Sequence, residues 1–118
     1  MRIVIADDQP QVRSAVRLLL EALPDISIVG EARDMGEAVA LLCQEQPDVL
    51  LLDWELPMIG GPDELSALRR CAPGLMVLAL SSRSEARRQA LDAGVEGFVS
   101  KGDPPESLLT ALAEAAAR

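Results

Sequence analysis

Histidine is absent from this chain, and cysteine occurs only at Cys43 and Cys71. Neither cysteine has another cysteine or a histidine nearby, which excludes the usual zinc sites and the CxxC redox motif. Cys43 lies in an apolar stretch with helical spacing, so we expect it to be a core residue. We do not expect a disulfide, because the chain is predicted to reside in a reducing compartment.

Aromatic residues are almost missing too, since Trp54 and Phe98 are the only two. Hydrophobic residues still make up 49% of the chain, so its core must be aliphatic. No apolar run approaches the roughly 18 residues of a membrane span. The chain opens with MRIVIADD, which enters a predicted strand directly and does not look like a signal peptide. We therefore expect a cytoplasmic protein that does not contact the membrane.

Positive charge is scarce, with 11 basic residues against 19 acidic ones and a formal net charge of −8. Nucleic-acid binders usually have the opposite balance, because they must neutralise phosphates. We therefore expect that this domain binds no nucleic acid by itself. The length of 118 residues fits one domain, predicted to cover residues 1–118.

Short apolar segments alternate with segments of helical spacing along the whole chain. The predicted strands are residues 2–6, 26–30, 48–52, 75–80 and 97–100. Helices are predicted from Pro10, after Asp34, through Leu65 and Leu68, over residues 84–93, and from about Pro104. Such alternation predicts an α/β fold with a parallel sheet and helices on both faces. Because residues 26–30 look like an edge strand, we expect the flavodoxin-like strand order 2-1-3-4-5.

Polar residues follow the central predicted strands at the points where these strands end. Asp7 and Asp8 follow the first strand, Asp53 follows the third and Lys101 follows the fifth. The fourth strand is followed by Ser81 and Ser82. Since ligands bind at the carboxyl ends of strands in open α/β sheets, we expect these side chains to converge.

Three neighbouring carboxylates repel one another and require a compensating cation. Mg²⁺ fits, because it binds one or two carboxylates together with phosphate oxygens. Lys101 is the only lysine among eleven basic residues, which favours a specific role for its compact charge. A carboxylate nucleophile beside a metal, a lysine and a hydroxyl suits phosphoryl transfer.

Four segments resemble the receiver domains of bacterial two-component response regulators, namely VIADDQPQVR, DVLLLDWELPMIGG, VLALSS and AGVEGFVSKG. Together they extend over nearly the whole chain. The stretches DDQPQVR and AGVEGFVSKGDPPESLLTAL are most similar to NarL/LuxR-type regulators. The resemblance implies a CheY-like signalling domain that is not an enzyme and assists only its own phosphorylation and dephosphorylation.

Carried over to this sequence, the resemblance implies that Asp53 is the phospho-acceptor and that Lys101 pairs with the phosphoryl oxygens. Asp7, Asp8 and Asp53 would bind Mg²⁺ together with the backbone carbonyl of Glu55. The Glu55 side chain also adds an acid beside the phosphoryl group, where we expect it to alter the dephosphorylation rate.

The resemblance also implies a conformational switch made of Ser81, which contacts the phosphoryl group, and Phe98, the switch aromatic. Ser81 precedes Lys101 by 20 residues, slightly fewer than is usual in the family. The intervening loop is therefore expected to be shortened, which leaves Ser82 as the alternative switch hydroxyl.

The implied partner is a sensor histidine kinase, and the implied output is control of transcription. A homodimer would form through the fourth helix, fifth strand and fifth helix, or through the first and fifth helices. LuxR-type proteins continue into a helix-turn-helix domain, which we expect to be missing from residues 1–118. A stand-alone or phosphate-independent receiver that acts through protein contacts is the alternative.

Two other classes on the same kind of fold fit less well. Mg²⁺-dependent phosphatases with an aspartate nucleophile need a second aspartate two residues later, where this chain has Gln9 after Asp7. Flavin-binding modules need a hydroxyl- and glycine-rich loop after the first strand, where this chain has DDQPQ.

Overall fold

A computed structural model of the chain describes residues 1–57 and 62–117. Its strands form a five-stranded sheet in the order β2-β1-β3-β4-β5, with all neighbours parallel, which confirms the predicted flavodoxin-like topology. The strands are β1 (Arg2–Ala6), β2 (Ser27–Ala32), β3 (Val49–Asp53), β4 (Met76–Ser81) and β5 (Gly97–Ser100).

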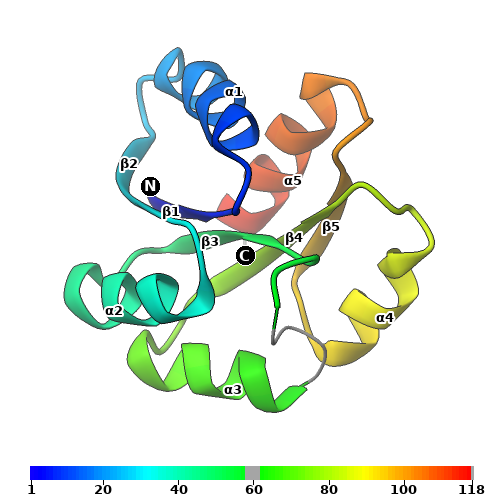
Figure 1. The fold of residues 1–118 in the computed structure, drawn as a ribbon. Helices are drawn as coiled ribbons and strands as arrows, with labels where there is room; N and C mark the ends of the chain where they lie inside the picture. The colour runs from blue at the N-terminus through cyan, green and yellow to red at the C-terminus, as the bar shows by residue number, and fades with distance from the viewer. Residues whose placement is uncertain (58–61, 118) are drawn as a thin grey trace.

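Helices cover both faces of this sheet, as Figure 1 shows. They are α1 (Pro10–Glu21), α2 (Met35–Glu45), α3 (Pro62–Cys71), α4 (Ala86–Ala93) and α5 (Pro105–Ala116). Helices α1 and α5 lie on one face, and α2, α3 and α4 lie on the other. Each face has its own aliphatic core, and every residue of β3 is buried.

Local signals in the sequence account for two of the helix ends. The Asp34 side chain caps α2 by accepting a hydrogen bond from the Glu37 N–H at 2.8 Å. Gly94 ends α4 in the left-handed region, with a φ of 109°, which glycine adopts without steric cost. The predicted strand at residues 26–30 is instead Ser27–Ala32, and α4 begins two residues later than predicted. Within the predicted loop at residues 53–62, positions 58–61 lie outside the described residues.

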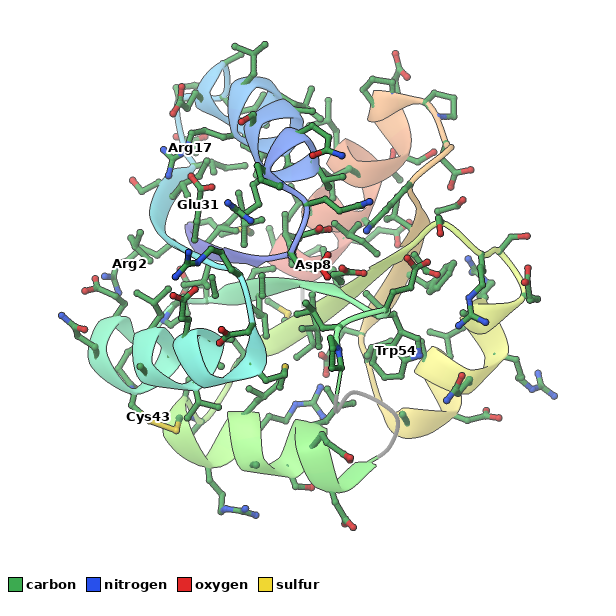
Figure 2. The ribbon with its side chains drawn as sticks, in the orientation of Figure 1. Arg2, Asp8, Arg17, Glu31, Cys43 and Trp54 are labelled. Atoms are coloured by element: carbon green, nitrogen blue, oxygen red, sulfur yellow. A yellow bond between two sulfur atoms is a disulfide. The ribbon has the colours of Figure 1, made fainter. Side chains whose placement is uncertain are left out.

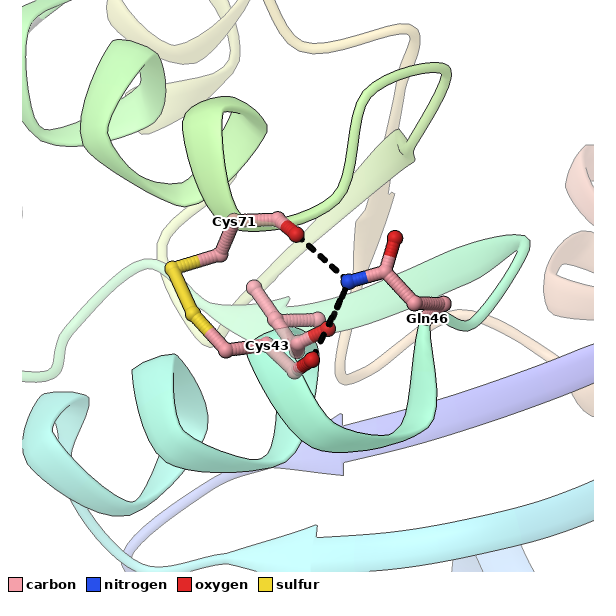
Figure 3. Close-up of a disulfide and its surroundings, with 4 residues drawn as sticks. Cys43, Gln46 and Cys71 are labelled. Carbon is pink, nitrogen blue, oxygen red and sulfur yellow. Dashed lines mark hydrogen bonds between the residues drawn. A yellow bond between two sulfur atoms is a disulfide. The ribbon is translucent and has the colours of Figure 1, made fainter.

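Both expectations for the cysteines were wrong. Cys43 is exposed, and its sulfur is joined to that of Cys71 in a disulfide between α2 and α3 (Figure 3). The helical period buries Leu42 and turns the next residue, Cys43, outward along the flank of α2. Because α3 ends beside this flank at Cys71, the two Cα atoms lie only 4.6 Å apart, within reach of a disulfide.

No helix within residues 1–57 and 62–117 is both long and apolar enough to cross a membrane.

Candidate functional site

Two buried carboxylates lie side by side at the carboxyl edge of the sheet. Asp53 is the last residue of β3 and is 1% exposed, while Asp7 directly follows β1 and is 0% exposed. Asp8 is exposed at the same edge (Figure 2). Carboxylate oxygens of Asp7, Asp8 and Asp53 all lie within 4.8 Å of one another. The convergence predicted for these three residues is therefore present.

Backbone groups fix the two buried carboxylates in place. The Gln9 N–H donates to Asp7 Oδ1 at 2.9 Å, and the Glu55 N–H donates to Asp53 Oδ1 at 2.9 Å. The Asp7 N–H donates to the carbonyl of Ala32 at 2.9 Å, which ties this turn to the end of β2. Each carboxylate is thus held by the turn that follows its own strand.

Lys101 brings a positive charge to both carboxylates. Its Nζ lies 2.9 Å from Asp7 Oδ2 and 3.2 Å from Asp53 Oδ1, and its side chain is 12% exposed. The Lys101 N–H donates to the Ser81 carbonyl at 2.8 Å, which places the lysine directly beyond the paired ends of β4 and β5. The pairing of β4 with β5 therefore places the Lys101 side chain beside the acidic cluster.

Burial and charge shift the ionisation of the site. Burial raises the pKa of Asp53, and the nearby Asp7 charge adds to this, outweighing the Glu55 N–H and Lys101. Burial acts to lower the pKa of Lys101, but Asp7 and Asp53 outweigh it, and the pKa is raised. The site thus holds an excess of buried negative charge that one lysine compensates only in part.

The donor set fits a hard divalent cation. Among the described residues, Asp7 Oδ2 is a buried side-chain atom that accepts no well-aligned hydrogen bond, and its partner is the Lys101 ammonium as an ion pair. A cluster of three carboxylates whose charge a single ammonium offsets only in part is the environment that Mg²⁺ or a similar ion stabilises. The assignment of the Glu55 carbonyl as a further ligand stays a prediction.

The two candidate switch hydroxyls are both engaged by one side chain. Ser81 is the last residue of β4 and is buried, whereas Ser82 is exposed. Both hydroxyls donate to Glu55 Oε1, at 2.9 Å for Ser81 and 2.5 Å for Ser82. Sequence reasoning placed Glu55 in the site but missed this contact, because it depends on how two separate turns face each other.

The two aromatic residues lie on the side of the sheet covered by α2, α3 and α4. Trp54 is buried in the core beneath α2, α3 and α4, and its backbone N–H donates to the Leu80 carbonyl at 2.7 Å (Figure 2). Phe98 is partly buried against the same core. The guanidinium of Arg87, on α4, lies 6.0 Å from the centroid of the Phe98 ring, within the range of a cation–π contact.

The chain is similar in sequence to known signalling proteins. The family model of the response regulator receiver domain matches residues 3–113. The nitrate/nitrite response regulator protein NarL of Escherichia coli K12 is 36% identical over 117 residues, covering 98% of this chain and 54% of the relative. This chain therefore spans about half the length of the curated relatives it matches.

Solved structures agree with the sequence comparison. The signal receiver domain of the response regulator NarL from Mycobacterium tuberculosis superimposes with a TM-score of 0.85 at 32% identity, covering 99% of this chain and 97% of that domain. A LuxR-family response regulator from Aurantimonas sp. SI85-9A1 gives a TM-score of 0.86 at 34% identity, covering 99% of this chain and 86% of that one.

Proposed function

Because the chain belongs to the response-regulator receiver family and is related to NarL, we propose that Asp53 accepts a phosphoryl group from a histidine kinase. The observation that supports this most directly is the position of Asp53. It is a buried carboxylate at a strand end, beside Asp7 and 3.2 Å from the Lys101 ammonium. An anionic nucleophile and a cation that can pair with incoming phosphoryl oxygens are therefore adjacent.

The transfer is a substitution at phosphorus. An Asp53 oxygen forms a bond to phosphorus while the phosphorus–nitrogen bond of the kinase's phosphohistidine breaks. The histidine nitrogen keeps the bonding electron pair and takes a proton from solvent. Asp53 becomes an acyl phosphate, and Lys101 exchanges its carboxylate partners for a phosphoryl oxygen. Beyond handling its own phosphate, we assign this domain no catalysis.

We propose Mg²⁺ as the cofactor, held by Asp7, Asp8, Asp53 and the backbone carbonyl of Glu55. When bound, the ion neutralises charge on the phosphoryl oxygens. The fit is supported by the clustered carboxylates and by the buried Asp7 oxygen, which pairs with the Lys101 ammonium and accepts no well-aligned hydrogen bond among the described residues. Burial and the neighbouring Asp7 charge raise the pKa of Asp53, and a bound cation would act in the opposite direction.

The acyl phosphate would then change the conformation at the end of β4 and, through it, the surface formed by α4, β5 and α5. Ser81 is the better switch hydroxyl, because it is buried on the strand next to Asp53, whereas Ser82 is exposed. Movement there reaches Phe98 through the pairing of β4 with β5, where Phe98 lies opposite Ala79. A repacked Phe98 would alter the surface formed by α4, β5 and α5.

That surface, or the α1–α5 face, would mediate homodimerisation. The α1–α5 face carries an open groove of about 300 Å³, lined by apolar residues that include Val16, Leu19, Val99 and Leu108. Leu18, also on α1, is 75% exposed. Control of transcription in the cytoplasm through a further DNA-binding domain is the output we propose, and a stand-alone receiver is the alternative.

Intact mass after incubation with acetyl phosphate tests the proposal, with and without Mg²⁺, on the parent and on Asp53→Asn. We expect one phosphate that requires Mg²⁺, is released by hydroxylamine and is absent from the variant. No adduct, under conditions that label a control receiver, would favour a phosphate-independent receiver. Turnover of a phosphomonoester would instead favour the phosphatase class.

A further inference from the structure

Three hydrogen-bond donors converge on a single oxygen of Glu55. Its Oε1 accepts the Ser81 hydroxyl at 2.9 Å, the Ser82 backbone N–H at 2.7 Å and the Ser82 hydroxyl at 2.5 Å. Glu55 lies in the turn after β3, and the two serines lie where β4 passes into the loop before α4. One carboxylate therefore bridges the turn that follows Asp53 and the point where β4 passes into the loop before α4.

This contact uses the single donor hydrogen of the Ser81 hydroxyl. A serine hydroxyl has one hydrogen to donate, and Ser81 gives it to Glu55. Its oxygen in turn accepts the Arg83 N–H at 3.0 Å. Ser81 cannot donate to a phosphoryl group on Asp53 unless it first releases Glu55.

We propose that the Glu55 side chain is an internal anion that holds the loop between β4 and α4 in the unphosphorylated protein. Glu55 occupies the same donors that a phosphoryl oxygen on Asp53 would recruit, so phosphorylation must displace it. In this role Glu55 is a positioning residue that acts through Ser81 and Ser82. The proposal rests on Asp53 being the phospho-acceptor. It identifies the contact of Glu55 with Ser81 and Ser82 as the one that the switch makes before phosphorylation.

The contact predicts competition between Glu55 and any phosphoryl group or analogue. Hydrogen bonds to a charged acceptor are stronger than those between neutral groups, and the analogue recovers only part of what it breaks. Removing Glu55 should therefore tighten binding of beryllofluoride to the Mg²⁺-loaded protein about tenfold. Trp54, the only tryptophan, is adjacent to Asp53 and can report binding through its fluorescence.

The first test uses the unphosphorylated protein without metal, so it does not depend on phosphorylation. Amide NMR of the parent, Glu55→Gln and Glu55→Ala should show the Ser82 N–H signal moving progressively upfield as its carboxylate partner is weakened and then removed. Glu85→Gln is the matched control. It also removes one negative charge from the segment before α4, but it leaves the hydrogen bonds between Glu55 and the two serines in place. A Ser82 signal that is unchanged in Glu55→Ala would overturn the proposal.

The second test measures beryllofluoride affinity in the same variants with Mg²⁺. We expect the affinity to rise from parent to Glu55→Gln to Glu55→Ala, because glutamine keeps a neutral acceptor and alanine keeps none. Equal affinities for the two variants would mean that only charge repulsion operates, which would overturn the resting contact. If the parent binds no beryllofluoride, the phospho-acceptor proposal fails, while the NMR result still decides whether Glu55 holds the loop.

Discussion

Lys101 Nζ lies 2.9 Å from Asp7 Oδ2, so the only lysine of the chain pairs with a carboxylate that is completely buried. The same ammonium also contacts Asp53 at 3.2 Å. Before any phosphate arrives, Lys101 therefore offsets the repulsion between two carboxylates. The proposed role in phosphoryl transfer and a role in stability therefore belong to the same side chain.

Replacing this lysine should destabilise the metal-free protein. In Lys101→Met the Asp7 and Asp53 carboxylates lose their shared cation, and removing one partner of a buried ion pair costs about 3–5 kcal/mol. Proton uptake by Asp53 will reduce the loss, so we expect roughly 2–3 kcal/mol in urea unfolding. Mg²⁺ should restore part of it.

Arg88→Met is the control for this prediction, since Arg88 is 89% exposed and lies 3.6 Å from Asp92. Exposed pairs of this kind contribute about 0–1 kcal/mol. Equal losses in the two variants would show that Lys101 is an ordinary surface charge.

Asp53→Asn should have the opposite effect and stabilise the metal-free protein. Because burial raises the pKa of Asp53, the folded state binds the proton more tightly than the unfolded state does. Keeping Asp53 ionised near neutral pH therefore costs stability, and the cost disappears as pH falls through the raised pKa. We expect a gain on the order of 1 kcal/mol, the scale set by a single pKa unit.

Unfolding curves near neutral pH and at about pH 5 check this sign. The advantage of Asp53→Asn over the parent should shrink as pH falls. Added Mg²⁺ should stabilise the parent more than the variant, because the variant lacks one of the proposed ligands. A stability advantage of Asp53→Asn that grows toward low pH would contradict a raised pKa of Asp53 in the folded protein.

The Cys43–Cys71 disulfide should make stability depend on redox conditions. It joins residues 28 positions apart, and closing a loop of that length contributes about 3–4 kcal/mol in the chain-entropy account. Gln46 Nε2 donates to the carbonyls of Cys43 and Cys71 at 3.2 and 2.6 Å, so these helix ends stay linked after reduction (Figure 3). We therefore expect the reduced protein to remain folded but to unfold at lower urea.

Two variants test this. Cys43→Ser should unfold at the same urea concentration as the reduced parent, and dithiothreitol should not change its unfolding. The second variant is Gln46→Ala. Because Gln46→Ala removes the second link between α2 and α3, it should destabilise the reduced protein more than the oxidised one. Alkylation followed by intact mass measures the oxidised fraction. A parent whose unfolding is unchanged by reduction would remove any stabilising role from the disulfide.

The sequence was sufficient where strand order alone determines position. Asp7, Asp53, Ser81 and Lys101 lie at the carboxyl ends of four neighbouring strands, and parallel pairing brings those strand ends together whatever the loops do. The disulfide was beyond this reasoning, because it depends on whether Leu42 or Cys43 turns inward, a difference of one helical position. The Glu55 contact was missed for a related reason, since hydrophobic patterns say nothing about how two turns face each other.

The contact between Arg87 and Phe98 gives the last prediction. A cation over an aromatic ring at a surface site is worth about 0.5–1 kcal/mol, which should favour the resting position of the ring. Arg87→Gln should therefore shift the switch toward its active arrangement by roughly two- to fivefold. Phe98 is the only phenylalanine, so its ring signals can be followed by NMR during a beryllofluoride titration.

Arg88→Gln is the control beside it, because Arg88 is on the same helix and is paired with Asp92 rather than with the ring. In a Phe98→Leu background, where dimerisation replaces the ring signals as the readout, Arg87→Gln should produce no shift, because Arg87 has no ring to contact. If Arg87→Gln shifts dimerisation equally with and without the Phe98 ring, Arg87 acts on the dimer surface directly. In that case phosphorylation of Asp53 does not act through the Arg87–Phe98 contact. The pairing of β4 with β5 would then be what links Asp53 to the α4–β5–α5 surface.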